Sequence, residues 1–417
     1  MDRRSIFDKA RFFETARRSS RVALILCIFA VPLAGGWLNL VEVMRDGVDG
    51  VQGLDGASGV AVSPDGLYVF SSASLDDGLA IFRRDASQDD LEFRYLFQDG
   101  VSGVFGLDGA SATVMSPDQR HVYATGADDD TLTVLRRDAS NDTFAFVASA
   151  ALEDGVGGVF GLEGASAVAV TPDDKHVVVA ARISSAVTMF RRDASMDNLS
   201  FVDVETGWVG LGGASAVAAR DETVFVVGED DDALAIFTRN AGSDELTFVE
   251  SHADGMAGVD GLDGARAVVA SPDGRFVYVA GAEDDAIAVF EEELGSYVFR
   301  QVYRDGVGGF DGLDGASALA LSPAGDLLFV AGRDESALAV LRRQANGTLT
   351  PLDVIRDGVD GIDGLGGAIS LAVSPDALHI YVAASDEDAV SALRIITLLF
   401  EDGFESGDTS SWTASVP

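Results

Sequence analysis

A short motif close to Gly-Leu-Asp-Gly-Ala-Ser recurs seven times along the chain. Its leucine stands at Leu54, Leu107, Leu162, Leu211, Leu262, Leu313 and Leu365, so neighbouring copies lie 49 to 55 residues apart. Repeats of roughly this length that contain four short strands are typical of the blades of a β-propeller. The repeat therefore restricts the fold more than any other feature of the sequence.

Each unit predicts four short strands and no helix. The first strand alternates small and branched apolar residues, as in SAVAVT at 166–171, and leads into a Ser-Pro-Asp-Gly turn such as 271–274. A second strand such as 276–280 and a third such as 79–82 follow. The fourth, such as 91–95, has polar residues at alternate positions, as expected for a half-exposed outer strand. The chain is thus predicted to be all-β.

The first and last units complete each other. The last unit supplies three strands, at 370–373, 379–383 and 389–393, while residues 38–44 form an unpaired strand near the start. Pairing the two would close the ring and remove exposed strand edges. We therefore predict a seven-bladed β-propeller with four-stranded blades, closed by the N-terminal strand.

The chain divides into three predicted parts. Residues 1–36 are basic and contain an apolar run at 22–34, which is short for a membrane span but suits a signal peptide ending in the small residues 34–36. An uncleaved membrane anchor is the alternative. The propeller covers 37–395, and a tail follows at 396–417. We expect a secreted or periplasmic protein of bacterial type, in which the tail serves attachment or packs as a terminal strand.

Acidic residues dominate the charge. Asp and Glu number 68 against 29 Lys and Arg, giving a net charge of -39, which argues against nucleic acid as a partner. Loops that join strands two to three and four to one emerge on one face of a propeller, and they carry about half of the carboxylates. We expect this acidic face to attract a small molecule, a cation or a basic protein surface. The opposite face is expected to be basic, from the arginine pairs at 83–84, 136–137, 191–192 and 342–343 and from Arg239. The protein is expected to be a monomer.

Two segments carry a family resemblance. Residues 271–281, SPDGRFVYVAG, and 374–384 resemble the YVTN-type and lactonase-like seven-bladed propellers of bacteria. The resemblance covers about residues 38–395 and implies the fold. It implies activity only weakly, because one propeller scaffold serves many functions.

Calcium is one candidate ligand of the acidic face. The Asp-Gly loops place Asp254, Asp260 and Asp263 at the same spacing as Asp305, Asp311 and Asp314. Calcium takes six to eight oxygen ligands from such groups. Solvated turns that keep the protein soluble are the alternative interpretation, and no other cofactor is predicted.

Departures from the repeat mark a candidate pocket. Ser58, Ser111, Ser166, Ser215 and Ser317 are expected to ring the central channel, but blade 5 has Arg266 and blade 7 has Ile369 at this position. Blade 4 has a shortened loop with Trp208, and His252 lies nearby. We predict a ligand pocket formed by Trp208, His252 and Arg266. The other three histidines, His121, His176 and His379, occupy one repeat position in separate blades and cannot converge on a metal.

These features support two functional hypotheses. Evenly repeated blades favour a binding or interaction module that acts through the acidic face without chemistry of its own. The resemblance and the local breaks favour the alternative, a lactonase-like hydrolase acting on a small sugar-acid lactone at the same face. The catalytic residues cannot be assigned from the sequence.

Overall fold

The computed structural model describes residues 36–85, 87 and 89–396. The predicted signal segment, apart from Gly36, and the tail beyond residue 396 lie outside the described residues. The described residues form β-strands joined by turns and loops. None of them forms a helix long and apolar enough to cross a membrane.

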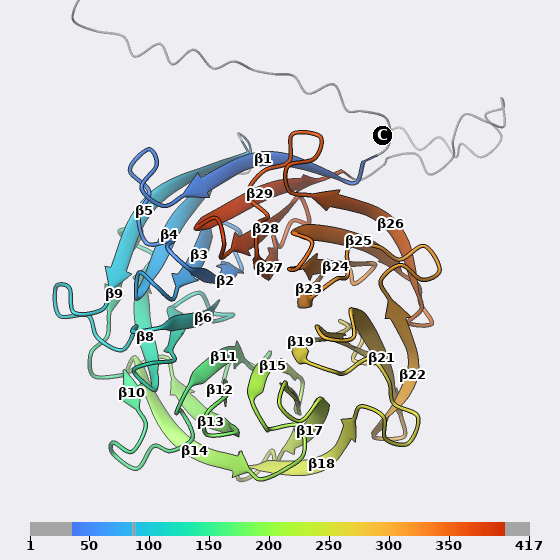
Figure 1. Cartoon of the computed structure of the whole chain (residues 1–417). Helices are drawn as coiled ribbons and strands as arrows, with labels where there is room; N and C mark the ends of the chain where they lie inside the picture. Colours follow the sequence, from blue (N-terminus) through green and yellow to red (C-terminus); the bar gives the residue numbers. More distant parts are fainter. Residues whose placement is uncertain (1–35, 86, 88, 397–417) are drawn as a thin grey trace, which may run out of the picture. The chain divides into compact units, whose positions relative to one another are not determined.

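Seven antiparallel sheets surround a central channel (Figure 1). Blades 1 to 3 comprise β2 (Ala57–Val62), β3 (Tyr68–Ala73), β4 (Gly78–Asp85) and β5 (Asp90–Gln98); β6 (Ala110–Met115), β7 (His121–Gly126), β8 (Thr131–Asp138), β9 (Thr143–Phe146) and β10 (Leu152–Glu153); and β11 (Ala165–Val170), β12 (His176–Ala181), β13 (Ala186–Asp193) and β14 (Asn198–Thr206). Blades 4 and 5 comprise β15 (Ala214–Arg220), β16 (Thr223–Gly228), β17 (Ala233–Arg239) and β18 (Leu246–Ala253); and β19 (Ala265–Ala270), β20 (Phe276–Gly281), β21 (Ala286–Glu293) and β22 (Ser296–Arg304). Blades 6 and 7 comprise β23 (Ala316–Leu321), β24 (Leu327–Gly332), β25 (Ala337–Arg343) and β26 (Leu349–Arg356); and β27 (Ala368–Val373), β28 (His379–Ala384), β29 (Ala389–Ile395) and β1 (Leu38–Arg45).

The N-terminal strand closes the ring. β1 pairs antiparallel with β29, with a register that runs from Leu38 opposite Ile395 to Arg45 opposite Ala389. In Figure 1 the blue β1 lies along the outer side of the red blade 7. Both the predicted fold and its closure are therefore confirmed.

The hydrophobic core lies between blades. Seven clusters of buried apolar side chains each combine residues of two adjacent blades. The leucine of every repeat motif is fully buried, which explains why the motif recurs. Because each cluster needs both neighbours, a single blade cannot bury its own apolar surface.

A bulge at the start of each first strand turns one side chain out of the ladder. In blade 3, for example, the register shifts between Ala165 and Ala167, so Ser166 is the extra residue. Bulges commonly re-aim a side chain in this way. The five bulge serines predicted to ring the channel donate hydrogen bonds of 2.6 to 2.8 Å to a backbone carbonyl of the next blade.

A second contact between blades uses the last residue of each loop between strands two and three. This residue adopts a left-handed conformation with φ between 48° and 57°. In five blades it is an aspartate that accepts a hydrogen bond from a backbone amide of the next blade: Asp77 from Gly109, Asp130 from Gly164, Asp232 from Gly264, Asp285 from Gly315, and Asp388 from Gly56. Many carboxylates of the acidic face therefore have a structural role.

A third contact changes the expectation for the opposite face. The second arginine of each predicted pair, and Arg239 at the equivalent position of blade 4, has a largely buried side chain that forms an ion pair with the Pro-Asp turn of the preceding blade: Arg84 with Asp376, Arg137 with Asp65, Arg192 with Asp118, Arg239 with Asp173, and Arg343 with Asp273. These contacts neutralise the arginines. The opposite face is therefore not the basic surface that the arginine pairs predict.

Candidate functional site at the channel mouth

The central channel contains a cavity of about 280 Å³. Its lining includes the five bulge serines, together with Arg266 and Ile369, the two residues that replace serine at this position. Because the bulge directs this side chain toward the channel, the serine-to-arginine change in blade 5 places a guanidinium group in the wall of the cavity.

Arg266 belongs to a three-residue ion-pair group. Its Nε and Nη2 atoms lie 3.2 and 3.0 Å from Oε1 of Glu229, which directly follows β16. The other carboxylate oxygen of Glu229 lies 3.0 Å from Nη2 of Arg182, which follows β12. Three adjacent blades thus contribute one side chain each. We call Arg182, Glu229 and Arg266 the mouth triad.

Of these three residues, the sequence predicts only Arg266 as part of a site. Glu229 lies in one of the acidic loops, and no prediction includes Arg182. The signal that reveals them is the residue directly after each second strand, which is Ser74, Ala127, Arg182, Glu229, Ala282, Arg333 and Ser385 in blade order. Long charged side chains appear there only in blades 3, 4 and 6, so an alignment of the repeats would have found the triad.

The triad combines a carboxylate with two guanidinium groups. The side chain of Glu229 is largely buried, at 16% exposure, whereas Arg182 is half exposed. Arg333, at the equivalent position of blade 6, has no hydrogen-bonding or ionic side-chain partner among the described residues. Guanidinium groups bind carboxylates and polarised carbonyl oxygens well because their N–H donors lie in one plane. The channel mouth can therefore accept a small anionic or carbonyl-bearing ligand on an otherwise acidic face.

The other two residues of the predicted pocket lie elsewhere. Trp208 stacks on Phe248, with ring centroids 4.1 Å apart, and its indole N–H donates to Glu205. His252 lies on the outer strand β18 against Phe290, and burial lowers the pKa of its imidazole. Neither residue lines the cavity that Arg266 lines.

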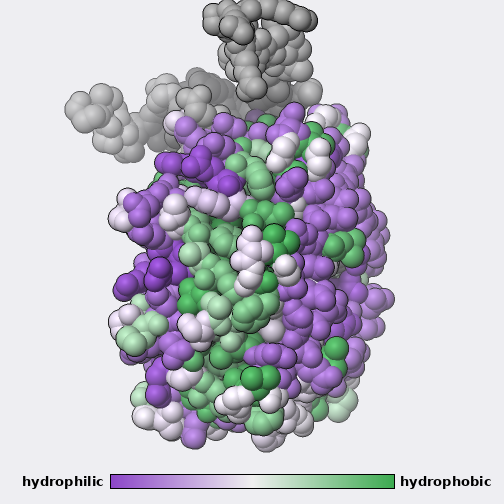
Figure 2. Space-filling model, turned by 90° about the vertical axis from the view of Figure 1, so that its left-hand side faces the viewer, coloured by the Kyte–Doolittle hydropathy of each residue, from purple (hydrophilic) through white to green (hydrophobic). Residues whose placement is uncertain are grey.

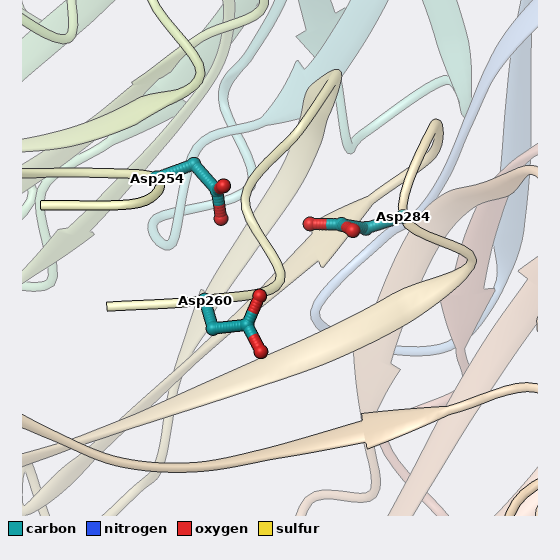
Figure 3. A group of neighbouring side chains, drawn as sticks. All are labelled: Asp254, Asp260 and Asp284. Carbon is teal, nitrogen blue, oxygen red and sulfur yellow. The ribbon is translucent and has the colours of Figure 1, made fainter. Parts of the chain in front are cut away.

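The structure groups some of the aspartates predicted to bind calcium. Asp254 and Asp260 point toward Asp284 (Figure 3), and Asp305 and Asp311 lie with Glu335. A third group of the same type is formed by Asp357, Asp363 and Glu387. Such carboxylate groups could hold a metal ion.

Each of these carboxylate groups is already joined by an arginine. Arg304, at the end of β22, makes two hydrogen bonds of 2.9 and 2.7 Å to Asp260 and one of 3.1 Å to Asp284. Arg356 and Arg45 bridge the other two groups in the same way. The arginine supplies the positive charge that a cation would otherwise provide.

Asp263 and Asp314 belong to a different contact. Asp263 lies beside Asp232, and Asp314 lies beside Asp285, the aspartates that join adjacent blades. Partial burial and these neighbouring carboxylates raise the pKa of both side chains. The six predicted aspartates are therefore divided between two kinds of carboxylate contact, and only four of them lie in the groups bridged by arginine.

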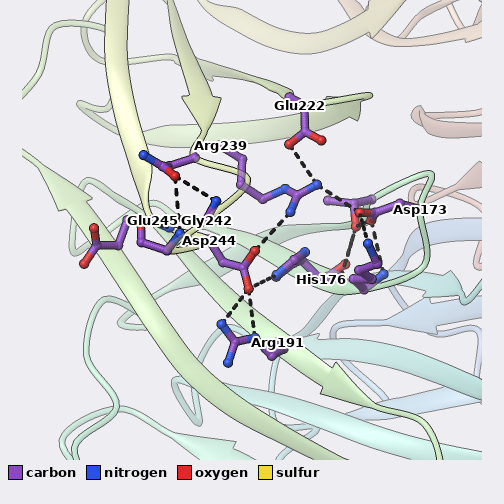
Figure 4. Close-up of polar contacts among 12 residues, drawn as sticks. Asp173, His176, Arg191, Glu222, Arg239, Gly242, Asp244 and Glu245 are labelled. Carbon is purple, nitrogen blue, oxygen red and sulfur yellow. Dashed lines mark hydrogen bonds and ion pairs between the residues drawn. The ribbon is translucent and has the colours of Figure 1, made fainter.

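Three histidines lie in equivalent contacts between blades, on the face opposite the channel mouth. His176 is buried beside Asp244 of the next blade, which also binds Arg191 and Arg239 (Figure 4). His121 pairs likewise with Asp197, and His379 with Asp89. Burial lowers the pKa of all three imidazoles. As predicted, these histidines occupy separate blades.

Solved structures that are similar to this one carry the names of different enzymes. The periplasmic gluconolactonase PpgL of Pseudomonas aeruginosa is 19% identical, with a TM-score of 0.60 over 75% of this chain and 87% of that one. A putative 6-phosphogluconolactonase of Bacteroides fragilis is 17% identical, with a TM-score of 0.60 over 76% and 86%. Hydrazine synthase of Kuenenia stuttgartiensis is 16% identical, with a TM-score of 0.60 over 86% and 100%. These likenesses show the fold alone.

The family comparison is more specific. No curated protein sequence matches the chain. The family model described as "Lactonase, 7-bladed beta-propeller" matches residues 113–260 and 256–397, which is more than half of the sequence. The chain therefore belongs to the lactonase family of seven-bladed β-propellers.

Proposed function

We propose that the protein is a lactonase-like hydrolase that acts on a small sugar-acid lactone at the channel mouth. The observation that carries the proposal is the mouth triad, in which Glu229 joins Arg182 to Arg266, the member of the triad that lines a cavity of about 280 Å³. Membership of the lactonase family supports this substrate class. The predicted signal segment makes the periplasm or the exterior of the cell the proposed location.

The triad supplies the groups that lactone hydrolysis requires. The Nη1 N–H groups of Arg266, which Glu229 does not engage, bind the lactone carbonyl oxygen and stabilise the negative charge that develops there. Glu229 accepts a proton from the attacking water, whose oxygen forms the new bond to the carbonyl carbon. The ring C–O bond then breaks, and the ring oxygen takes up the proton. Arg182 holds the carboxylate in place.

The test is a kinetic assay of lactone hydrolysis by the full mature chain, using a panel of aldonolactones and subtracting the uncatalysed rate. Glu229→Gln removes the base but keeps the side-chain volume, so we expect kcat to fall at least 100-fold. Arg266→Lys keeps the charge but loses the planar donor pair, so both kcat and KM should worsen. Met196→Gln, at a side chain that is 73% exposed on the opposite face, is the control and should leave both unchanged. Equal kcat in Glu229→Gln and the unmodified protein would overturn the proposal.

A second function is supported by the charge of the same face. We propose that carboxylates of the loops between strands two and three and between strands four and one bind a cation or a basic protein surface. Several of them, including Asp108, Asp128 and Asp230, are exposed and have no arginine partner among the described residues. Binding of this kind weakens as salt screens the charges, over about 8 to 10 Å at physiological ionic strength. A polylysine titration at low and high salt tests it.

A further inference from the structure

One loop position divides the ring into two unlike halves. Two residues before the repeated leucine, the seven blades carry Gln52, Phe105, Phe160, Val209, Asp260, Asp311 and Asp363. Blades 5 to 7 have an aspartate held by an arginine, as described above. Blades 2 to 4 have an apolar residue instead. Because the change affects three consecutive blades on each side, the two halves of the ring present different surfaces.

The apolar half is exposed. Phe105 is 47% exposed, Phe160 55% and Val209 50%, and Trp208 beside Val209 is 41% exposed. Figure 2 views the side of the ring that carries β5, β9 and β10, where a hydrophobic band lies between two hydrophilic faces. We call Phe105, Phe160, Trp208 and Val209 the apolar arc. Large exposed apolar side chains gathered on one side of a soluble domain mark an interaction site.

Carboxylates surround the apolar arc. The loops of blades 2 to 4 on this face carry the exposed acidic residues Asp108, Asp128, Glu153, Glu163 and Asp230. Their one basic residue, Arg182, is paired with Glu229. A partner must therefore combine positive charges with apolar side chains, since a neutral apolar surface would leave the carboxylates without compensation.

Charge also argues against two other occupants. A second copy of the chain brings a net charge of -39 against the same charge. The chain's own C-terminal segment carries Glu401, Asp402, Glu405 and Asp408 and no basic residue. Both would add like charges at this surface.

We propose that the apolar arc docks a cationic polypeptide segment that carries aromatic or aliphatic anchors. This inference rests on the second function proposed above and assigns that interaction to blades 2 to 4. The apolar side chains of the partner cover the arc, while its lysine or arginine residues face the surrounding carboxylates.

The experiment measures binding of a labelled synthetic peptide in which lysine alternates with tryptophan and leucine. The arc variant is Phe105→Gln/Phe160→Gln/Val209→Gln, which installs the residue that blade 1 carries at this position. The matched control is Met256→Gln/Val307→Gln/Val359→Gln, which removes residues that are 65%, 62% and 51% exposed from the loops of the other half. Cooperative thermal unfolding shows that both variants are folded.

We expect the arc variant to bind the peptide at least tenfold more weakly and the control variant to bind within twofold of the unmodified protein. A peptide with glutamate in place of lysine, and one with serine in place of the apolar residues, should each bind weakly. Equal affinity of both variants, with binding still weakened by salt, would overturn the arc but leave the interaction function. Absence of binding by the unmodified protein would overturn both. Self-association that the arc variant abolishes would identify a second copy as the occupant and overturn the cationic partner.

Discussion

At the scale of single residues, the mouth triad depends on two departures from the repeat. The bulge that directs serine to the channel in five blades directs Arg266 there in blade 5. The position after the second strand, a small residue in four blades, supplies Glu229 and Arg182. Sequence reasoning found the first departure because it interrupts a row of serines. It missed the second because Glu229 is followed by three further acidic residues and was interpreted with them.

Residue-scale reasoning also missed the buried arginine contacts. Arg84 and Asp376 are separated by 292 residues of sequence, and Arg137 and Asp65 by more than one repeat. No pattern of residues close together in the sequence indicates such a pair. Treating each arginine as part of its own loop led to the prediction of a basic face.

The histidines between blades predict a pH dependence of stability. Burial lowers the pKa of His121, His176 and His379 below the value of 6.5 that the unfolded chain has. The unfolded state therefore binds more protons in this range. The free energy of unfolding should be unaffected above pH 7 and fall as the pH drops below about 6.5, by at most about 1.4 kcal/mol per pH unit for each histidine.

Urea unfolding at pH 7.5 and pH 5.5 measures this dependence. Glutamine keeps a side-chain donor and does not titrate, so His121→Gln/His176→Gln/His379→Gln should lose most of the difference between the two pH values. A triple variant that retains the full difference would show that other groups cause it.

At the scale of elements, the sequence predicted the blades, their strand order and the closing strand. The repeat made this prediction possible because every turn, strand and buried leucine occurs in seven copies along the sequence. The sequence did not predict which contacts stabilise each interface between neighbouring blades. The interface between blades 6 and 7 has the serine contact of Ser317 but lacks the aspartate contact, since Ser336 stands in its place.

The interface between blades 6 and 7 also lacks the arginine contact, because neither the arginine nor its aspartate partner is present. Ile395 replaces the arginine, and Ala324 replaces the aspartate of the Pro-Asp turn. The N-terminal segment contributes other contacts to this interface. The backbone N–H of Trp37 donates to Asp353 at 2.6 Å, and its ring lies 5.5 Å from the guanidinium carbon of Arg342. The closing strand therefore joins blade 6 as well as blade 7.

Restoring the missing pair tests whether the arginine contact stabilises an interface. Ile395→Arg alone buries an uncompensated charge and should cost about 3 kcal/mol of unfolding free energy. Adding Ala324→Asp should recover part of that loss, with a coupling of about 1 to 2 kcal/mol in a double-mutant cycle measured by denaturant unfolding. A coupling near zero would mean that the repeated Arg and Asp pairs do not hold the blades together.

At the scale of the whole molecule, the contacts between blades repeat around the ring, whereas the surface residues differ from blade to blade. Serine, aspartate and arginine contacts repeat around the ring and account for much of its polar sequence. The apolar arc occupies blades 2 to 4, the carboxylate groups bridged by arginine occupy blades 5 to 7, and the mouth triad spans blades 3 to 5. Function in a closed repeat fold is expected at such departures, because the scaffold itself serves many activities.

The central claim is that the mouth triad forms a ligand site, and calorimetric titration of D-gluconate, the product of lactone hydrolysis, tests it most directly. Arg266→Ser is the decisive variant, because serine is the residue that five blades carry at this position, so the variant should fold at least as well as the unmodified protein. We predict one binding site per chain and an affinity at least tenfold weaker in Arg266→Ser. Equal affinity in the two proteins, or no measurable binding of gluconate to the unmodified chain, would contradict the account.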